Sequence, residues 1–239
     1  MTQLTLSTLY AYSEHYILTL GNRDVGSLNE FMAKLPGDEK QKLAQVREAY
    51  SYMMVHPGCK MMAPGTDMPE GLAKCIQALN TLYKSSPALY QMDDEYDGFE
   101  WVQLMKYEEN VITFLRKTEK PEETLLVICN FAAIPYENYQ VGVPFAGKYK
   151  EIFNSDAVEF GGEGVVNSRV KTAKAEECDE REYSIKVKLP ALGVSIYSCT
   201  PGKAPARKKV TAAKTAKNKT AKDKTAKDKT AGKLVRTVK

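Results

Sequence analysis

Two segments in the first third of the chain repeat apolar residues with the spacing of a helix. The first segment follows Asp38, which is a favourable N-cap residue after Pro36-Gly37. Its apolar positions recur at i, i+3, i+7 and i+10, on one helix face: Leu43, Val46, Tyr50 and Met53. His56-Pro57-Gly58 should end this helix, because proline and glycine both oppose its continuation.

A second helix of the same kind is predicted to start near Pro69 and to end at Ser85-Ser86-Pro87. Its apolar face is formed by Leu72, Ile76, Leu79 and Tyr83. Short strand-like segments precede each helix, at residues 16–20 and 59–63. This alternation of strand and helix predicts parallel strands that are joined by a crossover helix.

After Pro87 the pattern changes to strand-length apolar segments that are separated by turn residues. They lie at residues 98–103, 110–117, 124–131, 139–144, 149–155 and 183–198. The last segment should fold back as a hairpin across Pro190-Ala191-Leu192-Gly193. Residues 95–200 are thus predicted to form an antiparallel sandwich, and the fold class is α+β. The side chains predicted to face its interior are Trp101, Ile112, Phe114, Leu126, Ile128, Ile185, Val187, Val194 and Ile196.

The formal net charge of +4 averages two very different segments. From Lys203 onward there are 14 Lys and Arg against two Asp, whereas residues 1–202 carry 20 basic and 28 acidic residues. The basic segment repeats the units TAKNK and TAKDK, which contain almost no core-forming residue, so residues 201–239 are predicted to be a disordered tail. Two interpretations stay open: an arm that contacts polyanions, or a solvated extension that touches its own acidic body.

The composition argues against a membrane protein, a secreted protein and a metal-binding protein. No apolar run approaches the roughly 18 residues of a membrane span, and the first ten residues lack the pattern of a signal peptide, so we expect a cytoplasmic protein without membrane contact. The five cysteines are odd in number and never form a C-x-x-C pair, which favours buried reduced thiols. His15 and His56 are interpreted as structural, with a cationic His56 ring at a helix end. We expect no metal and no cofactor.

Several of these segments carry a resemblance to a known family. The stretches KLPGDEKQKLAQVREAYSYMMVHPGCKMM, ALNTLYKSSPALYQMDDEYDGFEWV and LLVICNFAAIPYENYQVGVP resemble the C-terminal part of bacterial 1,4-α-glucan (glycogen) branching enzymes, as do YKEIFNSDAVEFGG and LPALGVSIYS. The similarity covers nearly all of residues 4–200 in order. It implies the last strands and helices of a glycoside hydrolase family 13 (β/α)₈ barrel at residues 1–91. An α-amylase-type all-β domain would follow at residues 92–200.

The resemblance also bears on catalysis. After the seventh barrel strand the family carries a His-Asp pair that helps to hold the sugar at the cleavage site. Here Asn22 stands at the histidine position, Arg23 at the aspartate position, and Asp24 matches the glutamate that follows. The family's nucleophile and acid come from earlier strands than those this sequence matches, and retaining chemistry needs both carboxyl groups. We therefore expect a vestigial loop, no catalytic residue and no activity of this chain alone.

Other candidate residues lie around residue 96. The acidic loop of Asp93, Asp94, Glu95 and Asp97 resembles a calcium loop, but Leu104 stands where a bidentate glutamate is required. Tyr96 and Trp101 are candidates for stacking on glucose, since flat rings suit the apolar faces of the sugar, although Trp101 also fits a core position.

Three hypotheses therefore remain. The chain is an inactive branching-enzyme homologue, or a module that binds α-glucan such as glycogen or completes the barrel of a partner chain, or a polyanion-binding protein whose tail is the active part. In each case the two barrel strands leave open sheet edges, so residues 1–90 are expected to be looser than the β domain.

Overall fold

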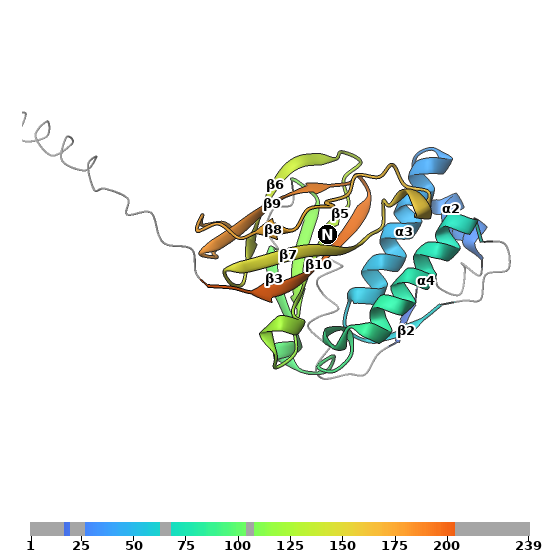
Figure 1. The fold of residues 1–239 in the computed structure, drawn as a ribbon. Coiled ribbons are helices and arrows are strands. Elements are labelled where there is room, and N and C mark those ends of the chain that lie inside the picture. The colour runs from blue at the N-terminus through green and yellow to red at the C-terminus, as the bar shows by residue number, and fades with distance from the viewer. Residues whose placement is uncertain (1–16, 20–26, 63–67, 104–107, 204–239) are drawn as a thin grey trace, which may run out of the picture. The chain divides into compact units, whose positions relative to one another are not determined.

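The computed structural model describes residues 17–19, 27–62, 68–103 and 108–203 (Figure 1). The helices are α2 (Leu28–Lys34), α3 (Glu39–Val55) and α4 (Glu70–Ser85). The first strands are β1 (Ile17–Thr19), β2 (Cys59–Met61), β3 (Phe99–Gln103), β4 (Val111–Arg116) and β5 (Leu125–Asn130). They are followed by β6 (Tyr136–Val143), β7 (Gly147–Asn154), β8 (Lys171–Thr172), β9 (Tyr183–Leu189) and β10 (Gly193–Pro201).

Both predicted helices and the predicted parallel strand pair are present. At the start of α3 the Asp38 carboxylate accepts a hydrogen bond from the Gln41 backbone N–H at 2.8 Å, and the Gln41 side-chain oxygen accepts one from the Asp38 N–H at 3.1 Å. This reciprocal cap fixes where the helix begins. β1 and β2 pair in parallel, with Ile17 opposite Cys59. Helix α2 was not predicted, and the Ser27 side chain caps it.

The strands of the β domain form a six-stranded sheet and a two-stranded ribbon. The order of the large sheet is β3-β4-β5-β10-β7-β8, and β6 pairs only with β9 among the described strands. The predicted hairpin across Pro190 is therefore wrong, because β9 and β10 belong to different sheets. Both edges of β10 are occupied, by β5 and β7. The Asn130 side chain donates to the Pro190 carbonyl at 2.7 Å and anchors the crossing between the two sheets.

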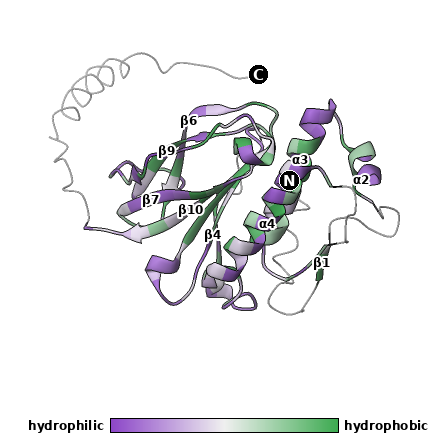
Figure 2. Ribbon diagram, turned by 45° about the vertical axis from the view of Figure 1, so that its right-hand side comes forward, coloured by the Kyte–Doolittle hydropathy of each residue, from purple (hydrophilic) through white to green (hydrophobic). Residues whose placement is uncertain are grey.

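The large sheet is buried on both faces. Along β5, Leu125, Val127 and Cys129 pack in one cluster with α3 and α4, whereas Leu126 and Ile128 pack in a second cluster with the β6-β9 ribbon. This alternation follows from the two-residue period of a strand. Figure 2 shows hydrophobic and hydrophilic stretches alternating along α4, as expected for a helix with one face on the core.

The interior side chains predicted from the sequence consequently divide between two cores instead of filling one. Those that face the helices are Trp101, Ile112, Phe114, Val194 and Ile196. Those that face the ribbon are Leu126, Ile128, Ile185 and Val187. Helices α3 and α4 thus share a continuous core with the sheet. For these two helices, the packing argues against the looser structure that the open strand edges predict.

Candidate functional site

The vestigial catalytic loop lies outside the described residues. This holds for Asn22, Arg23 and Asp24, and also for His15. The prediction that these positions do not support catalysis therefore rests on the sequence alone.

The two glucan-stacking candidates have different environments. Tyr96 begins a single 3-10 turn, Tyr96–Gly98, before β3, and it is 75% exposed. Trp101 on β3 is partly buried and packs edge-on against Phe99 and Phe114, with ring centroids 4.7 and 5.6 Å apart. Much of the Trp101 ring thus contributes to the core, whereas most of the Tyr96 side chain is exposed. Contact of either ring with glucan stays a prediction.

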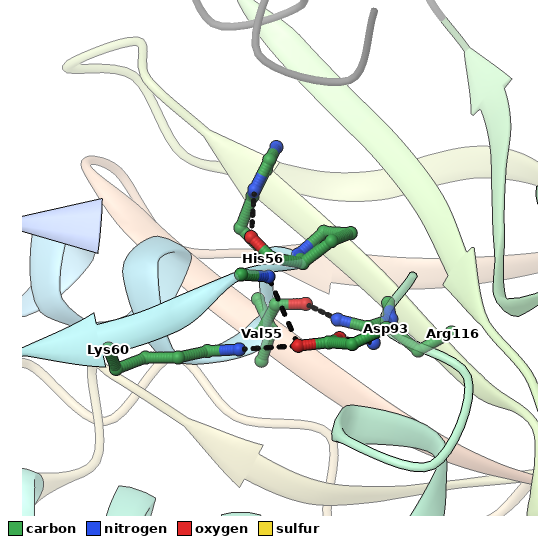
Figure 3. Close-up of polar contacts among 7 residues, drawn as sticks. Val55, His56, Lys60, Asp93 and Arg116 are labelled. Carbon is green, nitrogen blue, oxygen red and sulfur yellow. Dashed lines mark hydrogen bonds and ion pairs between the residues drawn. The ribbon is translucent and has the colours of Figure 1, made fainter. Parts of the chain in front are cut away.

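The acidic loop before β3 is tied into a buried ion pair (Figure 3). Arg116 of β4 has no exposed surface, and its Nη1 donates to the Val55 carbonyl at the end of α3, 2.8 Å away. Its Nη2 donates to Asp93. The other Asp93 oxygen accepts from the Gly58 N–H at 3.1 Å and pairs with Lys60 Nζ at 3.4 Å. Asp93 therefore joins the end of α3, β2 and β4, which is a structural role.

Burial changes the protonation of two groups in this cluster. The Lys60 ammonium lies 5.0 Å from the centre of the Tyr83 ring, and burial lowers its pKa to about 8, although Asp93 opposes the shift. Burial also lowers the pKa of His56 to about 4, and its Nδ1 lies 3.0 Å from the Pro57 carbonyl. The predicted cationic ring is therefore wrong. His56 is neutral near pH 7, because desolvation outweighs the attraction of the helix dipole.

The cysteines are all free thiols, but they are not uniformly buried as predicted. Cys75, Cys129 and Cys199 are buried, Cys178 is partly buried, and Cys59 is exposed on β2. Within the described ranges no group of three or more His, Cys, Asp and Glu side chains could hold a metal ion. The described helices also include none that is long and apolar enough to cross a bilayer.

Sequence reasoning missed two concave surfaces. A groove of about 810 Å³ runs between α4 and β7, and a pocket of about 400 Å³ beside β6 is lined by Tyr136, Tyr139 and Glu109 among others. The groove lies on the polar side of α4, which in the sequence is indistinguishable from an ordinary solvated face. Only the recurrence of Gln77, Thr81 and Ser85 at intervals of four residues marks one continuous polar stripe.

Comparison with known proteins gives a consistent result for both parts of the chain. Residues 101–200 match the family of alpha amylase C-terminal all-beta domains. The chain is 36% identical to the 1,4-alpha-glucan branching enzyme GlgB of Oceanobacillus iheyensis, in a match that covers 82% of this chain and 34% of the relative. The corresponding enzyme of Geobacillus stearothermophilus is 33% identical, over 81% of this chain and 34% of the relative. The chain therefore spans about a third of the length of these relatives.

Solved structures support the same fold at lower sequence identity. The crystal structure of AmyP in complex with maltose aligns with a TM-score of 0.55 and 14% identity, covering 85% of this chain and 45% of that one. A variant of AmyP in complex with maltotriose aligns with a TM-score of 0.56 and 13% identity, covering 84% and 44%. At such identities the similarity concerns the fold alone.

Proposed function

Because the chain belongs to the family of the 1,4-alpha-glucan branching enzymes, we propose that it is a non-catalytic member that binds α-glucan but forms no branches by itself. The observation that carries this proposal is the 36% identity to a branching enzyme, in a match that includes both the helices and the β domain. The sequence-based expectation of a cytoplasmic protein is part of the same proposal.

The absence of branching by this polypeptide alone is supported by the residues at the vestigial loop. Asn22 and Arg23 replace a His-Asp pair, and Arg23 brings the charge opposite to that of the aspartate. Retaining transfer also requires a nucleophile and an acid about 5 Å apart. Asp93, in the loop before β3, forms ion pairs with Arg116 and Lys60. Its carboxylate is therefore not available to replace the nucleophile or the acid.

Branch formation is tested by incubating the purified 239-residue polypeptide with amylose. Iodine staining and enzymatic debranching followed by chain-length analysis should give the same result as a blank without protein. New α-1,6 branches above the blank would overturn the non-catalytic part of the proposal.

Glucan binding is supported by the exposed Tyr96 ring. Flat rings suit the apolar faces of glucose, and aromatic side chains at binding surfaces supply large contact areas with a polar tip. Calorimetric titration with maltoheptaose should give measurable binding, and Tyr96→Ala should weaken it if this ring contributes. Tyr90→Ala is a matched control, because Tyr90 is also an exposed tyrosine, at 43% against 75% for Tyr96.

A second function is favoured by the β1-β2 pair, namely completion of a barrel with another chain. Among the described residues these two strands form a sheet of their own, with unpaired edges. Ile17 and Met61 are 59% and 54% exposed and lie on the same face of the pair, which is the type of surface that further strands cover. Light scattering of this chain mixed with the part of a relative that it does not cover should then show a one-to-one complex. Separate elution of the two chains would remove this function.

A further inference from the structure

Many basic side chains of the folded domain are already engaged by carboxylates. Within the described ranges eight of them form ion pairs: Lys40, Lys60, Lys74, Arg116, Lys117, Lys120, Arg181 and Lys188. Residues 1–202 as a whole carry 20 basic against 28 acidic residues, a net charge of −8. This part of the chain should therefore repel a polyanion and not bind it.

The charge reverses where the last strand of the domain ends. The Gly202 N–H donates to the Ala146 carbonyl at 2.8 Å, which ties the end of β10 to the start of β7. Lys203 follows and is exposed. From this residue onward the sequence has 14 Lys and Arg against two Asp, a net charge of +12 in residues 203–239. The dense positive charge therefore follows directly after an exposed point of the domain.

The composition of residues 203–239 narrows the kind of polyanion. The segment has no aromatic residue that could stack on a base, and its large apolar residues are only Leu234 and three valines. It also has no cysteine that could carry a lipid. A basic segment holds a membrane stably only together with a second, hydrophobic anchor, which is missing here. Neutralisation of phosphates needs neither feature, because it depends on charge alone.

We propose that residues 203–239 bind nucleic acid through its phosphates, without selecting a base sequence. Double-stranded DNA carries one negative charge per about 1.7 Å of its axis, and basic side chains that neutralise its phosphates release condensed counterions. Closely spaced lysines such as Lys217, Lys219 and Lys222 supply this charge. The property is independent of the proposed α-glucan binding, so either can fail without the other.

The test measures binding of the full chain to a short fluorescent DNA duplex by anisotropy at several salt concentrations. Neutralisation of six or more phosphates gives a slope of log K against log salt of about −5 or steeper. A fourfold rise in salt should then weaken binding by about three orders of magnitude. Two duplexes of equal length and unrelated sequence should bind equally well. A clear preference for one sequence would contradict recognition by phosphates alone.

Two variants with the same loss of charge show which part of the chain binds. The first replaces the six lysines of the repeated units by glutamine, at Lys217, Lys219, Lys222, Lys224, Lys227 and Lys229. The control makes the same change at six exposed lysines of the domain that form no ion pair with a described residue, namely Lys34, Lys84, Lys148, Lys150, Lys174 and Lys186. Thermal unfolding checks that both variants fold.

The first variant should weaken binding at low salt at least about tenfold and flatten the slope by up to about 5. The control should leave the slope nearly unchanged, because the domain lysines make no phosphate contacts. Equal losses in the two variants would overturn the assignment to residues 203–239, and so would the absence of DNA binding by the wild-type chain at low salt.

Two further ligands distinguish a duplex from other partners. A single strand of the same length should bind no more tightly than the duplex, since no ring is available for stacking. Vesicles of phosphatidylserine and phosphatidylcholine should sediment less of the chain than the duplex binds at equal phosphate concentration. Sedimentation with these vesicles without binding to DNA would identify a membrane surface as the partner and overturn the proposal.

Discussion

Glu48 provides a sharp test of how α3 is held on the sheet. This residue points into the core from α3 and is only 3% exposed, and its Oε1 has no hydrogen-bond partner in the described part of the chain. Burial raises the pKa of the Glu48 carboxyl well above its usual value, so folding favours the protonated form of this group. Glu48→Gln keeps the shape and removes the titration.

The size of the effect follows from linkage between protons and folding. An unfolded glutamate loses its proton near pH 4.3, whereas the buried carboxyl keeps its proton to a higher pH. Between the unfolded and the folded pKa the Glu48 contribution to stability therefore falls, by at most about 1.4 kcal/mol per pH unit. Stability from this group is thus complete at low pH and is lost as the pH rises. Between pH 4.5 and pH 6.5 the advantage of Glu48→Gln over the wild type should therefore grow, to an upper limit of about 2.4 kcal/mol that is set by the unfolded pKa of about 4.3.

His56 acts in the opposite direction over nearly the same range. Its pKa is lowered to about 4 in the folded protein, so the unfolded chain binds a proton below about pH 6.5 that the folded chain does not bind. The His56 contribution therefore rises with pH up to about 6.5, while the Glu48 contribution falls. In the wild type the pH dependence of the His56 contribution to stability opposes that of the Glu48 contribution. Comparison with Glu48→Gln separates the two contributions.

The assay is urea unfolding at pH 4.5, 5.5 and 6.5, followed by fluorescence of Trp101, the single tryptophan of the chain. Glu39→Gln is the matched control, because Glu39 lies on the same helix and is exposed. The stability of the Glu39→Gln variant should change with pH in the same way as that of the wild type between pH 4.5 and pH 6.5. If wild type and Glu48→Gln give parallel stability curves, Glu48 is hydrated or paired in solution, and the packing of α3 described above is incorrect.

Three further predictions concern the same region. Asp93→Asn removes the carboxylate that pairs with the buried Arg116 and with Lys60, and should cost about 3–5 kcal/mol in urea unfolding. Asp94→Asn, at the exposed neighbour, should be nearly neutral, and equal effects of the two variants would show that the ion pair is not structural. An NMR titration should find the His56 ring neutral at pH 5.5 and protonated only near pH 4, and an ordinary titration near pH 6.5 would contradict its burial. Limited proteolysis should release a resistant fragment that contains α3 and α4 together with the sheet, and early cleavage near residue 90 would instead support the looser helical segment that the sequence predicts.

Local signals in the sequence were sufficient for α3, α4 and most of the strands, but not for α2 or the two-residue strand β8. The Asp38 cap and the Pro57-Gly58 stop are interactions between near neighbours, so α3 could be bounded before its packing was known. The parallel pairing of β1 with β2 was predicted from the alternation of strand and helix, because a helical crossover favours parallel strands.

Long-range pairing and burial could not be predicted in the same way. The segment around Pro190 has the sequence of a hairpin turn, and only the occupation of both β10 edges by β5 and β7 excludes that pairing. The lowered pKa of His56 and the raised pKa of Glu48 depend on burial among residues distant in the sequence, including Phe99 beside His56 and Cys129 near Glu48. The α4 groove likewise exists only because β7 and the segment around Phe160 lie against the helix.

Affinity electrophoresis of the full chain in native gels that contain glycogen tests the central proposal of α-glucan binding most directly. Mobility should fall progressively as the glycogen concentration rises and should not change in gels that contain dextran, an α-1,6-linked glucan. The loss of mobility should be reversed by added maltoheptaose. Identical migration with and without glycogen would contradict the proposal that this chain binds α-glucan.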